Sequence, residues 1–157
     1  MKPKSVFIMF LVGLLALAVL GNLSSPVAAQ KSSDGEDSKP VKNADYWFNR
    51  GALCATYGND TAAIEYFQKS ISLDPNRSGA YFSQGISYGQ LNEFDKALAL
   101  IDKAIAMEPQ NGLFVYGRAR VQLLAGNRRN AMADFRKAAQ LDDEDAQAYL
   151  RFIGQRW

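Results

Sequence analysis

The sequence has 157 residues, a formal net charge of +2 and no histidine. This length fits one domain, since domains cluster at roughly 100–150 residues, and a hydrophobic content of 48% argues against a mainly disordered chain. The lack of histidine excludes catalytic triads and metal sites that need an imidazole, and the single cysteine excludes an internal disulfide.

Residues 1–29 have the features of an export signal. A short basic start, Lys2 and Lys4, precedes the uncharged apolar run of residues 6–20, and the small residues 27–29 then form a cleavage site. This order predicts an exported protein, periplasmic or extracellular after cleavage. No charged residue lies between Lys4 and the cleavage site, so an uncleaved membrane anchor is the alternative. Membrane contact is expected only in that second case.

Residues 30–43 differ sharply in composition from the segments on either side. They are rich in Ser, Asp and Lys, and Val41 is the one large apolar residue that they could contribute to a core. Such a segment cannot bury enough apolar surface to offset the entropy lost on ordering. We therefore expect a flexible polar linker here.

The rest of the sequence contains three segments of 34 residues in register, 44–77, 78–111 and 112–145, with no insertion between them. Small residues recur at three positions of this register, a large apolar residue recurs at a fourth, and Pro or Asp recurs near the end. These sets are Gly51, Gly85 and Ala119; Ala63, Ala97 and Ala131; Ser70, Ala104 and Ala138; Phe67, Ile101 and Phe135; and Pro75, Pro109 and Asp143. The periodicity predicts stacked units that are unstable singly and bury a common core together.

These segments resemble tetratricopeptide repeats, a 34-residue helix–turn–helix in which large, small, aromatic and Pro residues recur at fixed offsets. The resemblance implies an all-α fold, a right-handed α-solenoid of stacked antiparallel helix pairs. It also implies a capping helix over residues 146–157. The apolar side of that helix is expected to consist of Ala148, Tyr149, Phe152 and Ile153.

The sequence departs from the family pattern at several positions. The Leu that usually precedes the recurring small residue is replaced by Arg50, Gln84 and Arg118, which predicts looser packing or altered contacts in the same fold. Cys54 stands where Tyr is usual, on the apolar side of its predicted helix. We interpret it as a buried structural thiol, with a reactive or partner-linking thiol as the alternative.

The sequence predicts no catalytic, cofactor-binding or metal-binding site. Its glycines recur as packing or turn residues, and the carboxylates Asp142 and Asp143 lie in a connecting turn. Basic residues are concentrated in the third segment, where residues 112–141 contain six basic residues and one acidic residue. A solvated helix face is the simpler interpretation of this charge, and a site for an acidic partner or anionic lipid is the alternative. Nucleic acid is not expected as a partner of an exported protein.

The resemblance also implies where a partner would bind. In the family, the first helix of each unit lines a concave groove that holds an extended peptide or a helix of a partner protein. The residues expected to line it here are Phe48, Asn49, Ala52, Phe82, Ser83, Ile86, Tyr116 and Arg120. The basic residues with which some members clamp a C-terminal carboxylate are missing, so apolar or mixed segments are the expected ligands. Packing between neighbouring units is the alternative role of the aromatic residues.

The resemblance implies a non-catalytic adaptor, scaffold or assembly factor that binds other proteins and needs no cofactor. Two other possibilities follow from the same residues. The first is a self-associating structural module of the cell envelope, or a membrane-anchored scaffold, in which homo-oligomers form through exposed ends or grooves. The second is an enzyme whose site has no recognisable motif.

Overall fold

The computed structural model describes residues 41–157, so the predicted export signal and most of the predicted linker lie outside the described residues. The described part forms seven α-helices and no β-strand. They are α1 (Ala44–Thr56), α2 (Asp60–Leu73), α3 (Ser78–Gln90), α4 (Phe94–Met107), α5 (Gly112–Leu124), α6 (Arg128–Gln140) and α7 (Glu144–Phe152). None of these helices has the length and hydrophobicity that a bilayer crossing requires. The predicted all-α fold is confirmed.

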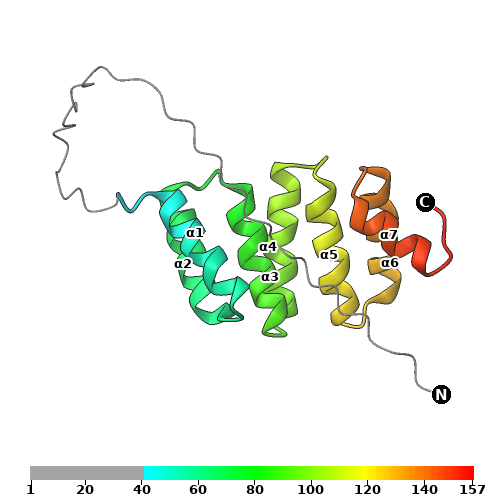
Figure 1. The fold of residues 1–157 in the computed structure, drawn as a ribbon, viewed down its shortest axis with the longest axis horizontal. Helices are drawn as coiled ribbons and strands as arrows, with labels where there is room; N and C mark the ends of the chain where they lie inside the picture. Colours follow the sequence, from blue (N-terminus) through cyan, green and yellow to red (C-terminus); the bar gives the residue numbers. More distant parts are fainter. Residues whose placement is uncertain (1–40) are drawn as a thin grey trace, which may run out of the picture. The chain divides into compact units, whose positions relative to one another are not determined.

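The helices form consecutive pairs that stack in chain order (Figure 1). α1 packs on α2, α3 on α4 and α5 on α6, and each pair contacts the next helix along the chain. Contacts of α1 with α3 and of α3 with α5 are more extensive than those between neighbouring even-numbered helices among residues 41–157. The odd-numbered helices therefore lie on the inner side of the stack. We call the surface formed by α1, α3 and α5 the inner face.

Short polar turns begin and end the paired helices. The side chains of Asn43 and Asn59 accept hydrogen bonds from backbone N–H groups three residues later, and so cap α1 and α2. Between paired helices the backbone passes through the left-handed region, at Gly58 with a φ of +74° and at Gly126 with a φ of +81°. Asn92 takes this conformation in the second unit, because its short polar side chain tolerates a positive φ better than most residues do.

The recurring small residues allow the paired helices to approach closely. A Cβ atom added to Gly85 would lie 2.9 Å from the carbonyl oxygen of Ala97 and 2.7 Å from Cγ1 of Ile101. Larger side chains fill the space beside these contacts. Those that are fully buried, with at most 1% exposure, include Phe67, Ile101, Phe135 and Leu150. The buried residues form three clusters along the stack, and the partly buried Ile105 packs against all three.

The C-terminal helix α7 begins at Glu144 and ends at Phe152, short of the residue 157 expected for the cap. Asp143 caps it by accepting a hydrogen bond of 2.8 Å from the backbone N–H of Ala146. Ala146 stands 34 residues after Gly112 in the register of the units. α7 therefore occupies the place of the first helix of the next unit.

The buried side of α7 differs from the predicted one. Ala146 and Leu150 are fully buried, whereas Ala148 is exposed and Phe152 is 88% exposed. The prediction that Ala148, Phe152 and Ile153 cover the core is wrong, and of the four expected residues Tyr149 alone packs against it. Ala146 and Leu150 instead pack in one cluster with Ala138 and Ala139 of α6.

Candidate functional site

Helical spacing places a row of side chains on the inner face. Residues four apart lie on one side of a helix, so Phe82, Ile86 and Gln90 of α3 face the same way. On α5 the matching row contains Tyr116, Arg120 and Leu124. The two rows meet at a hollow between α3 and α5, which is lined by Ile86, Gly89, Gln90, Arg120, Val121 and Leu124.

The three aromatic residues expected in the groove are half-buried and pack against neighbouring helices. The ring of Phe82 stacks on Phe114 with 4.7 Å between centroids, and a Cβ atom at Gly117 would overlap the Phe82 ring. Phe48 lies beside Phe67, with 5.6 Å between the ring centroids, and Tyr116 lies 5.8 Å from Phe135.

These aromatic contacts join helices of one unit or of neighbouring units, so the rings have a structural role. They leave only part of each ring on the inner face. Among the other expected residues, Asn49 and Arg120 are exposed, whereas Ala52, Ser83 and Ile86 are partly buried. The structure brings Ile86 and Arg120 together in the hollow, while the three residues on α1 lie apart from it.

Two leucines of α5 are exposed beside the predicted groove residues. Leu113 stands at a groove position of the family but was not among the expected lining residues, and Leu124 was not predicted. Leu113 is 50% exposed and Leu124 is 60% exposed. Leu113 precedes Tyr116 by three residues and Leu124 follows Arg120 by four, so both lie on the inner-face side of the helix. This spacing can be read from the sequence, and it could have indicated that both leucines lie beside the predicted groove residues. The outcome is an apolar row along α5 with one cation within it.

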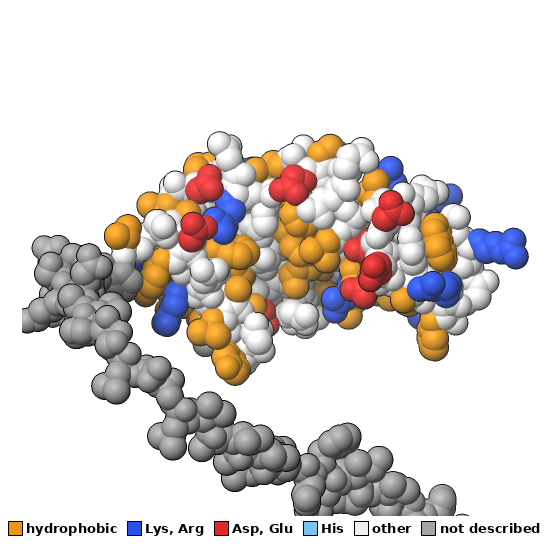
Figure 2. All heavy atoms as spheres, turned by 45° about the horizontal axis from the view of Figure 1, so that its top comes forward, with side chains coloured by type: hydrophobic (Ala, Val, Ile, Leu, Met, Phe, Trp, Pro, Cys, Tyr) orange, Lys and Arg blue, Asp and Glu red, His pale blue; other side chains and the backbone are white. Residues whose placement is uncertain are grey.

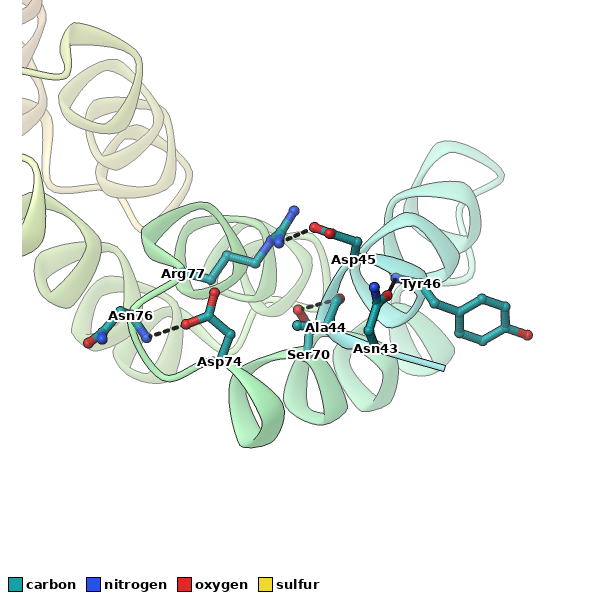
Figure 3. Close-up of polar contacts among 8 residues, drawn as sticks. All are labelled: Asn43, Ala44, Asp45, Tyr46, Ser70, Asp74, Asn76 and Arg77. Atoms are coloured by element: carbon teal, nitrogen blue, oxygen red, sulfur yellow. Dashed lines mark hydrogen bonds and ion pairs between the residues drawn. The ribbon is translucent and has the colours of Figure 1, made fainter. Parts of the chain in front are cut away.

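The ends of the inner face differ in charge. At the α1 end, Arg77 lies 4.5 Å above the Phe48 ring and pairs with Asp45, so its charge is balanced (Figure 3). At the α5 end, Arg120 lies 5.8 Å from the Tyr116 ring and makes no ion pair within residues 41–157. Burial raises the pKa of the Tyr116 hydroxyl.

Polar contacts join the first and second helices within a unit. In the first unit, the Ser70 hydroxyl donates to the carbonyl oxygen of Ala44 at 2.9 Å, as Figure 3 shows. In the second unit, the Ser78 hydroxyl and the Asn111 amide both donate to the Glu108 carboxylate. These two hydrogen bonds lower the pKa of Glu108. These contacts hold the start of α1 and of α3 against the end of the second helix of the same unit.

The polar residues that replace the usual Leu have defined contacts. Arg118 donates two hydrogen bonds to Asp134, of 2.7 and 2.8 Å, and a third of 2.7 Å to Asp102. Gln84 is 3% exposed and donates to Gln68 and to a backbone carbonyl of α2. These residues join α3 and α5 to even-numbered helices. At these two positions, the departure from the family's Leu therefore leads to altered contacts rather than to looser packing.

The basic residues of the third unit do not form one free patch. Arg118 is held by two carboxylates, and Arg136 donates a hydrogen bond to Gln155. Figure 2 shows that, on one side of the molecule, basic side chains are interspersed with acidic ones around an area of hydrophobic side chains. Within residues 41–157, no group of three or more His, Cys, Asp or Glu side chains is arranged to hold a metal ion. Cys54 is a free, partly buried thiol.

Comparison with known proteins gives relatives of diverse activity. A UDP-N-acetylglucosamine–peptide N-acetylglucosaminyltransferase of Giardia intestinalis is 24% identical over 104 residues, which are 66% of this chain and 7% of that protein. Human tetratricopeptide repeat protein 6 is 32% identical over 76 residues, which are 48% of this chain and 15% of that protein. The chain thus spans only a small part of these relatives.

Solved structures share the fold. The first TPR domain of Spaghetti, bound to an HSP90 peptide, superposes with a TM-score of 0.64 at 19% identity, over 72% of this chain and 91% of that one. YrrB, described as a TPR protein with an unusual peptide-binding site, also superposes with a TM-score of 0.64 at 19% identity, over 71% of this chain and 58% of that one. Tetratricopeptide repeat models match residues 44–77 and 82–151. The chain therefore belongs to the tetratricopeptide repeat family.

Proposed function

We propose that the inner face binds an extended, mainly apolar peptide segment of a partner protein. The observation that carries this proposal is the exposed row of Leu113 and Leu124 on α5, which meets Ile86 at the hollow beside Arg120. Rigid helices hold this row in place, so binding requires little ordering of the protein itself. The peptide complex of the Spaghetti domain and the peptide-binding site of YrrB support the proposal by analogy of fold.

The proposed ligand has apolar side chains and one acidic or polar group. Complete burial of one Leu-sized side chain contributes about 1.5–3 kcal/mol, so two or three such contacts contribute about 3–9 kcal/mol before the costs of association. These contacts alone therefore give weak binding, no tighter than roughly 0.1 mM. Arg120 is free to donate hydrogen bonds to a carboxylate of the peptide, because it makes no ion pair within the described residues. It would orient the segment along α5.

The protein would then act as an interaction module, an adaptor or assembly factor, rather than as an enzyme. If the export signal predicted for residues 1–29 operates, the proposed site of action is the periplasm or the extracellular space. The glycosyltransferase relative bears little on it, since the alignment includes only 7% of that enzyme.

Peptide display on the purified protein tests the inner face directly. We expect selected peptides to be rich in apolar residues, and Leu124→Asp or Arg120→Glu to weaken their binding at least tenfold. Leu53→Asp is the matched control, because Leu53 is 49% exposed and lies outside the inner-face rows. Equal binding by all three variants would contradict the proposal. Alanine at Phe48, Phe82 and Tyr116 is unsuitable, since those rings pack the units together.

A further inference from the structure

The outer side of helix α1 carries a row of three residues that no described helix covers. Tyr46, Arg50 and Leu53 lie on one side of α1, because residues three or four apart share a face of a helix. Arg50 is exposed, Leu53 is 49% exposed and Tyr46 is half-buried. Within residues 41–157, α1 packs on α2 and α3 at one end of the row of helices (Figure 1). We call these three residues the α1 stripe.

The same positions of the next two units are covered. They are Ala80, Gln84 and Ser87 on α3, and Phe114, Arg118 and Val121 on α5. Those on α3 are at most 3% exposed, and on α5 the aromatic and aliphatic residues are at most 5% exposed. The three residues on α5 are an aromatic residue, an arginine and an aliphatic residue, in the same order as in the α1 stripe. α1 therefore exposes a side that matches, in chemistry, a side that α5 buries.

Helix α4 shows how this side of α5 is covered. Asp102 of α4 accepts a hydrogen bond of 2.7 Å from Arg118. Leu98, one turn before Asp102, packs against the cluster that contains Val121. Ile105, one turn after Asp102, packs against the cluster that contains the aromatic residue of the α5 row. The covering side of α4 thus consists of an aliphatic, an acidic and an aliphatic residue, and it runs antiparallel to α5.

The charges around the α1 stripe favour an acidic covering helix. Lys42 and Lys69 lie 5.8 and 4.6 Å from the centroid of the Trp47 ring, next to the stripe. Arg50 lies 5.6 Å from the centroid of the Tyr66 ring. None of these three cations forms an ion pair within residues 41–157, although α1 and α2 carry three acidic residues, Asp45, Asp60 and Glu65. A carboxylate from a covering helix would complement them, whereas a second copy of the stripe would bring like charges together.

We propose that the α1 stripe binds an amphipathic helix of a partner protein, in the way that α4 covers α5. This helix runs antiparallel to α1 and has an aliphatic, an acidic and an aliphatic residue at positions i, i+4 and i+7. The acidic residue pairs with Arg50, and the aliphatic residues pack on Leu53 and Tyr46. The stripe lies on the side of α1 opposite to Phe48 and Ala52, so this docking is independent of peptide binding by the inner face.

Tryptophan fluorescence of the full-length protein measures this docking. Of its two tryptophans, Trp47 contacts Tyr46, so Trp157→Phe leaves one reporter beside the stripe. The probe is a peptide with the α4 sequence, residues 94–107, held helical by an amide bridge between Lys103 and a glutamate introduced by Ala99→Glu. We expect a saturable change in Trp47 emission at peptide concentrations on the order of 0.1–1 mM. A titration without any change would overturn the proposal.

Variants of the protein locate the contact. Arg50→Glu and Leu53→Asp should each raise the dissociation constant at least about tenfold, because each removes one of the contacts of the stripe. Arg129→Glu is the matched control, since Arg129 is exposed on α6 and the change in net charge is the same as in Arg50→Glu. It should weaken binding less than about threefold, because salt screens charges that lie far from the stripe. Equal weakening by Arg129→Glu, or no weakening by Leu53→Asp, would overturn the proposal.

A charge exchange tests the pairing with Arg50. Asp102→Lys in the peptide should weaken binding to the wild-type stripe at least about tenfold, since it opposes two cations. The same peptide should bind the Arg50→Glu protein to within about threefold of the original pair, because opposite charges then meet again. Failure of this exchange to restore binding would overturn the proposed arrangement.

Discussion

Replacing Arg118 with leucine, the residue usual at this position in the family, should destabilise the protein. The guanidinium forms a bidentate ion pair, with two hydrogen bonds, to Asp134 and a single hydrogen bond to Asp102. Asp134 is 8% exposed, so without Arg118 its carboxylate stays buried and unpaired. The Asp102 carboxylate would remain hydrated without Arg118, because its side chain is 56% exposed. The loss should therefore arise from Asp134 rather than from Asp102.

The magnitude follows from these exposures. Removing one partner of a fully buried ion pair costs about 3–5 kcal/mol, and the 26% exposure of the Arg118 side chain reduces this to about 2–3 kcal/mol. Asp102→Asn removes a solvent-screened contact and should cost less than about 1 kcal/mol. In Arg118→Leu with Asp134→Leu no buried charge remains, and stability should return to within about 1 kcal/mol of wild type.

Urea unfolding followed by circular dichroism measures these differences as a double-mutant cycle. The reasoning fails if Arg118→Leu costs no more than Asp102→Asn. It also fails if the double variant is as unstable as Arg118→Leu alone, because the buried unpaired carboxylate would then not be the cause.

Three further predictions concern single residues. Gly85→Ala should lower stability by about 1–3 kcal/mol in thermal melts, because the added Cβ meets backbone atoms of α4 that cannot move aside, and an unchanged melting temperature would contradict this. Folding lowers the pKa of Glu108, so its stabilising effect is present above its unfolded pKa of about 4.3 and disappears as the pH falls through the lower folded value. The urea midpoint of the wild type should therefore drop between about pH 5 and 3, and that of Glu108→Gln should drop less. Because burial raises the pKa of Tyr116, an alkaline absorbance titration should contain a late-ionising tyrosine that Tyr116→Phe removes, and retention of that step would refute the assignment.

The 34-residue register predicted most of the fold because it encodes contacts between neighbours. The close approach at Gly85, the fully buried Phe67 and the turn at Gly58 all follow from residue size or backbone freedom, which are visible in one sequence. The outward side of α7 was not predictable in this way, because both sides of that helix carry apolar residues. The side that contains Leu150 is buried because of where α7 lies in the stack.

The candidate site was less predictable than the fold for a related reason. Phe82 occupies a groove position, yet its ring turns into the space left by Gly117 of the next unit. Likewise, Arg118 finds one carboxylate sixteen residues before it and another sixteen residues after it. The sequence shows the charges and the rings, but which of them meet depends on how far one unit rotates against the next.

Contacts between units run only from neighbour to neighbour, and this has a consequence for local opening. A helix pair at an end is held on one side, whereas α3 and α4 are held on both. Amide hydrogens of α3 and α4 should therefore exchange with solvent more slowly than those of α1 or α7, in a gradient that falls toward both termini. The hollow at Ile86 has one wall in this slowly exchanging centre, so fraying of α1 or α7 would leave that wall in place.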